Sequence, residues 1–287
     1  MWRLAHISDL HFGRTDPAVV RALHADISEH MPSLVVVSGD LTQRAKVDQF
    51  KAAREFLDTL PVPYLVVPGN HDIPVYDVVR RFTDPFARYR RHISEKLDQF
   101  RYLDGLAVLG LNTARAYILD FAEGRVNRRQ MTMVQECLGD LPDTVFKVVF
   151  THHPFLPPPD VPGERLVGRA REALTWLEKA GVDLLLAGHL HKAYNGDVMT
   201  RHAHLARSIL VAQASTATST RLRAEPNAYN LIDIDPPRLT ISVRSWEGAR
   251  FMPGLVSRYE KRGQLWTKQG VDSGLAAIDA LREQKAG

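Results

Sequence analysis

Short apolar runs that each end in a polar cluster are the feature that most constrains the fold of this chain. Residues 64–67 form such a run, Pro68 and Gly69 end it, and Asn70-His71-Asp72 follows at once. An apolar run that stops at proline or glycine is typical of a buried strand. Similar clusters occur at Asp9-Leu10-His11, Gly39-Asp40, His152-His153-Pro154 and Gly188-His189-Leu190-His191. In open α/β sheets, ligands bind at the carboxyl ends of the strands, so these clusters predict one shared site.

The segments between the clusters predict a layered α/β fold, because strands and helices alternate along the chain. Helices are expected at residues 18–30, 47–60, 128–138 and 170–180, and strands at 2–7, 34–37, 64–67, 106–111, 146–150, 183–187, 208–212, 229–234 and 239–244. An alanine-rich helix is expected near residues 273–284. Without internal repeats or linkers, residues 1–287 are expected to form one domain, with a candidate cap segment near 73–104 and a C-terminal extension from about 250.

Composition narrows the class of protein. Hydrophobic residues make up 45% and charged residues 24% of 287 residues, which is ordinary for a globular protein. The net charge of +4 comes without a dense basic stripe, so nucleic acid is not the expected partner. Cys137 is the single cysteine, which excludes an intrachain disulfide and favours a reducing compartment. The N-terminus lacks a signal-peptide pattern and no apolar run is long enough for a membrane span, so a cytoplasmic protein is expected.

The polar clusters have the composition of a metal site. Their side chains are imidazoles, carboxylates and an amide, from Asp9, His11, Asp40, Asn70, His71, Asp72, His152, His153, His189 and His191. A set with nitrogen and oxygen but no thiolate suits manganese, iron or zinc, and differs from a structural zinc site. These ligands are too many for one ion. Two ions about 3.5–4 Å apart, sharing a carboxylate, would use them better and can clamp a phosphoryl group.

The five polar clusters, in their order along the chain, resemble the full signature of the calcineurin-like metallophosphoesterases. They span residues 9–191, and the His152-His153-Pro154 form is most similar to the class III cyclic nucleotide phosphodiesterase and glycerophosphodiesterase branch. The resemblance implies a four-layer αββα sandwich of two mixed β-sheets flanked by helices. It also implies that the strands after residue 205 complete the second sheet.

The resemblance assigns a role to each residue. Asp9, His11 and His191 would bind the first metal. Asn70, His152 and His189 would bind the second, and Asp40 would bridge the two. His71 would face the substrate, Asp72 would sit behind His71 and fix its orientation, and His153 would lie outside the ligand set. The implied cofactors are two divalent or mixed-valence ions, manganese and/or iron, with zinc also compatible.

The expected function is a phosphodiesterase that hydrolyses small anionic phosphodiesters, of the cyclic nucleotide or glycerophosphodiester type. The reaction would be in-line attack of a metal-bridging hydroxide, with His71 helping the alcohol to leave. A DNA nuclease of the same superfamily and a phosphomonoesterase are the alternatives, and a homodimer is left open. Three other functions fit less well. Protein phosphatases have a different motif where this chain has Val67-Pro68, and lipid A pathway hydrolases have a different residue where this chain has His71. Inactive scaffolds lack metal ligands. Gln43 replaces an acidic residue common in this branch, which leaves substrate detail open.

Residues 80–92 form a basic and aromatic segment. One interpretation is a cap that meets anionic substrate. The favoured interpretation is a helical surface with solvated arginines and an aromatic inner face.

Overall fold

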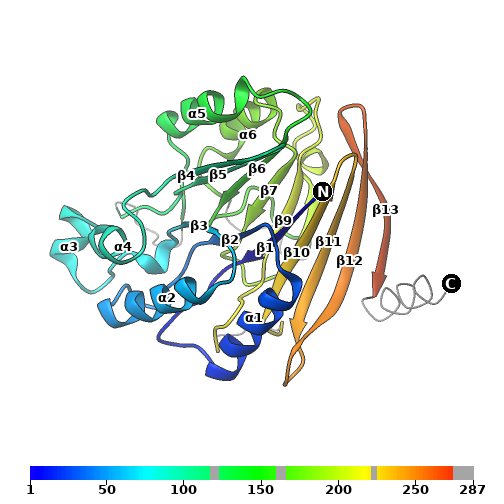
Figure 1. Ribbon diagram of the computed structural model, residues 1–287. Helices are drawn as coiled ribbons and strands as arrows, with labels where there is room; N and C mark the ends of the chain where they lie inside the picture. Colours follow the sequence, from blue (N-terminus) through cyan, green and yellow to red (C-terminus); the bar gives the residue numbers. More distant parts are fainter. Residues whose placement is uncertain (117–122, 160–165, 221–224, 274–287) are drawn as a thin grey trace.

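The computed structural model describes residues 1–116, 123–159, 166–220 and 225–273. Its strands form a seven-stranded sheet in the order β13-β12-β11-β10-β1-β2-β3 and a six-stranded sheet in the order β4-β5-β6-β7-β9-β8. Figure 1 shows the two sheets face to face, with α1 and α2 outside one and α5 and α6 outside the other. The predicted sandwich of two mixed sheets flanked by helices is confirmed.

The first half of the chain builds the parallel part of the first sheet. Strands β1 (Trp2–Ile7), β2 (Leu34–Ser38) and β3 (Tyr64–Val67) alternate with helices α1 (Pro17–His30) and α2 (Val47–Thr59). Strands β2 and β3 are almost entirely apolar because residues on both of their faces are buried, as parallel strands between two layers require. Asp16 caps α1 through a hydrogen bond from the Ala18 N–H to its carboxylate, 2.8 Å long.

The second sheet has a parallel centre and antiparallel edges. Its parallel strands are β5 (Leu106–Leu111), β6 (Phe146–Thr151), β7 (Leu184–Ala187) and β9 (Leu210–Gln213). Strands β4 (Gln99–Leu103) and β8 (Tyr194–Asp197) pair antiparallel at the two edges. Helix α5 (Arg128–Val134), which continues as the π-helical turn η2 (Gln135–Gly139), and α6 (Ala170–Lys179) pack outside this sheet.

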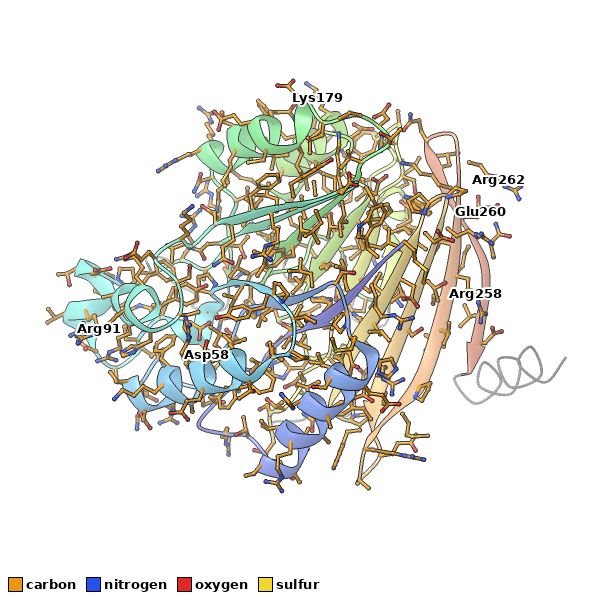
Figure 2. The ribbon with its side chains drawn as sticks, viewed as in Figure 1. Asp58, Arg91, Lys179, Arg258, Glu260 and Arg262 are labelled. Carbon is orange, nitrogen blue, oxygen red and sulfur yellow. The ribbon has the colours of Figure 1, made fainter. Side chains whose placement is uncertain are left out.

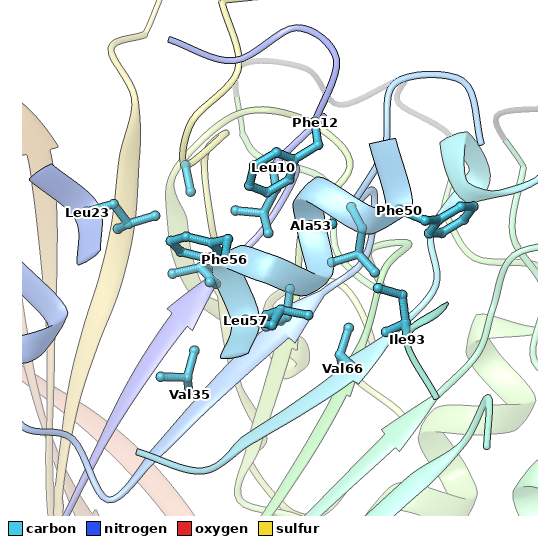
Figure 3. Close-up of a cluster of buried hydrophobic side chains, with 14 of the residues drawn as sticks. Leu10, Phe12, Leu23, Val35, Phe50, Ala53, Phe56, Leu57, Val66 and Ile93 are labelled. Carbon is cyan, nitrogen blue, oxygen red and sulfur yellow. The ribbon is translucent and has the colours of Figure 1, made fainter. Parts of the chain in front are cut away.

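The core lies in three layers that follow from this arrangement. Between the sheets, Val36 of β2 packs in the same cluster as Val108 of β5 and Val148 of β6. Outside the first sheet, α2 inserts side chains such as Phe50 and Leu57, as Figure 3 shows. Burial of such side chains is the main favourable term in folding. It fixes the sheets so that all the parallel strands end at one edge.

The last strands join a different sheet from the one expected. Strand β9 joins the second sheet, but β10 (Ala228–Asp235), β11 (Arg238–Trp246), β12 (Phe251–Arg262) and β13 (Leu265–Ser273) extend the first sheet. The physical reason is the pairing of β10 with the free side of β1, in which His6 faces Asn230 across an antiparallel register. The sequence interpretation also missed β4, β8, β12 and β13 as strands.

Three smaller elements complete the described chain. The turn η1 (Asn70–Asp72) leads into α3 (Val78–Thr83) and α4 (Ala87–His92), and η3 (Val198–Thr200) follows β8. The helix expected near residues 273–284 lies outside the described residues, because the structure describes only its first residue, Ser273, at the end of β13. The domain boundaries and the cap segment stay predictions. Within the described ranges, every helix is too short or too polar to cross a lipid bilayer.

Candidate metal centre

The five predicted clusters meet at the carboxyl edge of the two sheets. Backbone hydrogen bonds join their loops: the Asp9 N–H donates to the Gly39 carbonyl at 3.1 Å, and the His11 N–H donates to the Asp40 carbonyl at 2.9 Å. The Gly188 N–H donates to the His152 carbonyl at 3.0 Å, which joins the loops after β7 and β6. The His189 N–H donates to Oδ2 of Asp9 at 3.0 Å, which joins the loops of the two sheets into one rim.

Five of the predicted site residues have a left-handed backbone. The φ angles are 52° for Asp9, 51° for His11, 52° for Asp40, 73° for His189 and 54° for His191. This conformation is sparsely populated by residues other than glycine and is characteristic of functional sites, where the surrounding structure holds it in place. The turns aim the side chains inward immediately after each strand.

Two glycines are needed because neighbouring side chains lie against their backbone. A Cβ on Gly188 would collide with the Ser8 hydroxyl, and a Cβ on Gly69 would collide with the Asp40 carboxylate. Each glycine immediately precedes a predicted ligand, His189 or Asn70. These two glycines therefore allow neighbouring loops to approach closely, because they have no side chain.

Asp9, His11 and His191 form the first group of potential ligand atoms. Nε2 of His191 lies 3.1 Å from Oδ1 of Asp9 and 3.2 Å from Nε2 of His11. The Nε2 of His11 lies 3.6 Å from the same Asp9 oxygen. All three side chains are buried. Three donor atoms at these separations enclose a space of the size that one metal ion occupies.

Asn70, His152 and His189 form the second group. Oδ1 of Asn70 lies 3.0 Å from Nε2 of His152 and 3.1 Å from Nδ1 of His189, and the two ring nitrogens are 3.2 Å apart. Asp40 lies between the groups, with Oδ2 3.7 Å from Nε2 of His11 and Oδ1 3.4 Å from Nε2 of His152. One carboxylate therefore faces both groups.

Outer hydrogen bonds orient several of these side chains. The Ser8 hydroxyl and the His189 N–H donate to Oδ2 of Asp9, at 2.6 and 3.0 Å, while Oδ1 has no hydrogen-bond donor and points to the first group. Nδ1 of His152 donates to the Ser38 carbonyl at 2.8 Å, which leaves Nε2 with a lone pair toward Asn70. Such outer partners fix the tautomer and direction of metal ligands.

Electrostatics keep the ligand atoms in the form that binds metals. Burial alone would raise the pKa of Asp9, but His191 and His11 hold that pKa well below its ordinary value. Burial likewise opposes ionisation of Asp40, while His152 and His71 lower its pKa overall. Burial lowers the pKa of His189 to about 4. The carboxylates are therefore anionic and His189 is neutral at pH 7, as metal ligation requires.

His71 lies beside the second ligand loop, and its ring is oriented by Gln43 and not by Asp72, the partner that was expected. Its ring nitrogen Nδ1 donates to the backbone carbonyl of Gln43 at 2.8 Å, and its ring is 4.8 Å from that of His11. The prediction that Asp72 fixes His71 is wrong in its geometry. The buried Asp72 carboxylate accepts instead from the N–H groups of Leu41, Thr42 and Gly69, because these backbone donors reach it at 2.9–3.1 Å.

Asp72 thus joins two ligand loops to each other. The Thr42 hydroxyl adds a fourth hydrogen bond to it, at 2.9 Å. Burial and the neighbouring charge of Asp40 raise the pKa of Asp72 to about 6. The carboxylate sits at the junction between the loops after β2 and β3.

His153, which was expected outside the ligand set, packs directly against two of the potential ligands. Its ring is 4.8 Å from that of His152 and 4.7 Å from that of His189, and it shares with them a cluster of potential ligand atoms. Its Nδ1 is 2.8 Å from the Thr113 hydroxyl. Thr113 was missed as a site residue, as were Ser8 and the Gln43 carbonyl. Thr113 did carry a signal, because Asn112-Thr113 is a polar pair directly after the apolar run at 106–111.

The donor set fits two ions. Two potential metal-binding clusters are fully buried, Asp9 with His11 and His191, and Asp9 with Asp40 and His152. Two more contain one partly buried residue each, His11 with Asp40 and His71, and His152 with His153 and His189. The unpartnered buried Oδ1 of Asp9 is the kind of atom that an ion would satisfy. Imidazole, carboxylate and amide donors without thiolates suit first-row divalent ions.

Several known proteins are similar to this chain in sequence. A glycerophosphodiester phosphodiesterase of Enterobacter lignolyticus is 29% identical over 169 residues, 54% of this chain and 57% of that protein. A protein of Fibrobacter succinogenes, named as a probable cyclic nucleotide phosphodiesterase, is 30% identical over 162 residues, 53% of this chain and 57% of that protein. The match thus spans less than two thirds of the length of each relative.

A solved structure is similar in fold. The purple acid phosphatase PPD1 of yellow lupin superposes with a TM-score of 0.66 at 12% identity, over 88% of this chain and 52% of that one. Residues 3–193, well over half of the chain, match the sequence pattern of the calcineurin-like phosphoesterases. This protein therefore belongs to the calcineurin-like phosphoesterase family.

Proposed function

We propose that this protein is a metal-dependent phosphodiesterase that hydrolyses small phosphodiesters, of the cyclic nucleotide or glycerophosphodiester type. The observation that carries the proposal is the position of Asp40 between two groups of ligand atoms, with His71 at their side. The names of the relatives from Enterobacter and Fibrobacter support diesters over monoesters. No observation favours the nuclease alternative.

The proposed ligand assignment follows the two groups. Asp9, His11 and His191 would hold one ion, Asn70, His152 and His189 would hold the other, and Asp40 would contribute to both. Manganese and iron are the expected ions, and zinc is compatible with the same donors. The carboxylates of Asp9 and Asp40 offset part of the positive charge that two ions bring.

Bound divalent ions would supply Lewis-acid polarisation of the phosphoryl oxygens and lower the pKa of water. The chain's own contribution centres on His71. Because Nδ1 donates to the Gln43 carbonyl, Nε2 is the nitrogen available to the substrate. A protonated Nε2 would donate its proton to the departing alkoxide oxygen, which leaves as the alcohol. Asp72 keeps the loop of His71 in place through its bonds to residues 41, 42 and 69.

The rim also sets the orientation of His71 relative to the ions. Oδ1 of Asp40 accepts a hydrogen bond from the His71 N–H at 2.8 Å, so the bridging carboxylate and the proton donor are joined through one peptide. A phosphate seated against both ligand groups would lie next to the His71 ring. His71 and His189 are only partly buried, so they mark the side of the site that faces solvent. A cytoplasmic location and a homodimer remain part of the proposal, with no interface assigned.

A substrate panel tests the proposal. Purified protein with Mn²⁺ is offered cyclic AMP, cyclic GMP, glycerophosphocholine, a phosphomonoester and single-stranded DNA. Diester turnover that a chelator abolishes and Mn²⁺ restores is expected, with monoester and DNA turnover far slower. Faster hydrolysis of DNA would favour the nuclease, and no turnover with any divalent ion would contradict an enzyme.

A further inference from the structure

A cluster of exposed apolar side chains lies on and before α3, a few residues after η1. It comprises Val75, Tyr76, Val78, Val79 and Phe82, here called the α3 patch. Tyr76 and Val79 are each 75% exposed and Val78 is 58% exposed. Figure 1 shows α3 at the far left, beyond α4 and away from both sheets. Apolar patches that face solvent in this way mark contacts with a protein or a membrane.

Positive charge surrounds the α3 patch. Residues 73–92 contain five arginines and two aspartates; Arg81 is buried, which leaves an excess of two positive charges at the surface. The aspartates are engaged within the segment, since Asp77 pairs with Arg80 and Arg88, and Asp84 pairs with Arg90. Arg91 is exposed on α4, and Figure 2 shows it on the same side of the molecule as α3.

A second basic residue reaches the patch from another loop. The guanidinium of Arg44, an exposed residue, lies 5.4 Å above the ring of Tyr76. Arg88 joins the same loop to α4 by donating to the Ala45 carbonyl at 2.9 Å. The patch is therefore held by contacts with the loop after β2. Arg44 is thus a cation in direct contact with an aromatic ring of the patch.

We propose that the α3 patch docks the protein onto the surface of a bilayer that contains acidic phospholipids. Apolar side chains that enter the acyl boundary, bordered by arginines that meet anionic headgroups, are the combination that interfacial segments use. A second copy of the chain is a poorer partner. In a two-fold contact the same patch meets itself, so the excess positive charge of one copy would face that of the other.

This docking would place the candidate metal centre near the membrane surface. Gln43 accepts the hydrogen bond of His71, and the next residue, Arg44, contacts Tyr76 of the patch. The patch thus borders the rim that carries His71. Docking does not depend on the proposed reaction, because it uses none of the ligand residues.

Vesicle sedimentation tests the inference. The whole protein is mixed with vesicles of phosphatidylcholine alone or of phosphatidylcholine with phosphatidylglycerol. Sedimentation with the acidic vesicles only is expected, and it should weaken at high salt because the arginines are screened. The double substitution Val78→Ser with Val79→Ser should lower the partition coefficient roughly tenfold or more. Arg44→Gln and Arg91→Gln should each lower it roughly fivefold.

Leu265→Ser with Val271→Ser is the matched control. These residues are 49% and 46% exposed on β13 and lie outside the patch, so this variant should bind acidic vesicles as the wild type does. Absence of binding to acidic vesicles would overturn the inference. So would an equal loss in both double variants. A dimer seen by light scattering that only the Val78/Val79 variant dissociates would assign the patch to a second copy instead.

Discussion

The backbone N–H of His71 donates a hydrogen bond to Oδ1 of Asp40 at 2.8 Å. Asp40 is the carboxylate that faces both groups of potential metal ligands, and His71 is the proposed proton donor. The bond joins the loop after β2 to the loop after β3. It holds the proposed proton donor at a fixed position relative to the carboxylate of Asp40. A displacement of either loop would disturb both functions.

Replacement of His71 by alanine separates chemistry from metal binding. His71→Ala should lower turnover of bis(p-nitrophenyl) phosphate about 10²–10⁴-fold, the usual contribution of a general acid or base. Its metal content, measured by elemental analysis, should stay at the wild-type level because the ring bonds to Gln43 and lies outside the two groups. Loss of an ion from this variant would make His71 a ligand and contradict the assignment.

Replacement of Asp72 should act on stability as well as on turnover. Its carboxylate accepts four hydrogen bonds from Leu41, Thr42 and Gly69, so Asp72→Ala leaves buried donors unsatisfied. A loss of at least about 3 kcal/mol in the free energy of unfolding is expected, from about 1–3 kcal/mol for each orphaned group. Urea denaturation measures it. A variant with wild-type stability would show that these bonds do not hold the loops together.

Part of the site follows directly from the sequence. The candidate ligand residues could be predicted because each follows an apolar run, and both the run and the polar cluster are local patterns. The same holds for the parallel strands β1, β2 and β3. The position of Asp40 between the two groups of potential ligands depends on tertiary structure. Only the resemblance to the calcineurin-like metallophosphoesterases indicated it from the sequence.

Other parts depend on contacts that no local pattern records. The Gln43 carbonyl orients His71, and a backbone carbonyl has no sequence signature. Strands β12 and β13 were missed because one of their faces meets solvent, which breaks up the apolar run with residues such as Arg258 and Lys268. The sheet of β10 and β11 was mistaken because β10 pairs with β1, a partner more than 200 residues away.

The close approach at Gly188 predicts a steric effect. Gly188→Ala places a Cβ against the Ser8 hydroxyl, which hydrogen-bonds to Asp9, so the loops of β1 and β7 must move apart. A loss of about 1–3 kcal/mol in the free energy of unfolding is expected, together with weaker metal binding by calorimetry. Gly270→Ala is the control, because a Cβ there meets nothing within 4 Å. Equal behaviour of the two variants would refute the close approach.

Buried His6 predicts a pH dependence of stability. Burial lowers its pKa from 6.5 to about 3, and the ring contacts the Ser38 hydroxyl at 2.9 Å. Below pH 6.5 the His6 side chain is protonated in the unfolded chain but stays neutral in the folded chain. The free energy of unfolding therefore decreases as the pH is lowered.

Between pH 7.5 and pH 5 this residue alone should cost roughly 2 kcal/mol. His6→Gln cannot take up that proton, so its loss of stability over the same interval should be smaller by that amount. Urea denaturation of both proteins at the two pH values, in one metal-containing buffer, provides the comparison. An identical pH dependence in both would be inconsistent with a neutral buried His6.

The central claim is that Asp40 holds two ions at once, and metal stoichiometry tests it most directly. After loading with Mn²⁺ and removal of free ion, elemental analysis should find two ions per wild-type chain and fewer than two in Asp40→Ala, which should also lose diester turnover. Circular dichroism should show both proteins folded. Two ions per chain in Asp40→Ala, or a single ion in the wild type, would contradict the account.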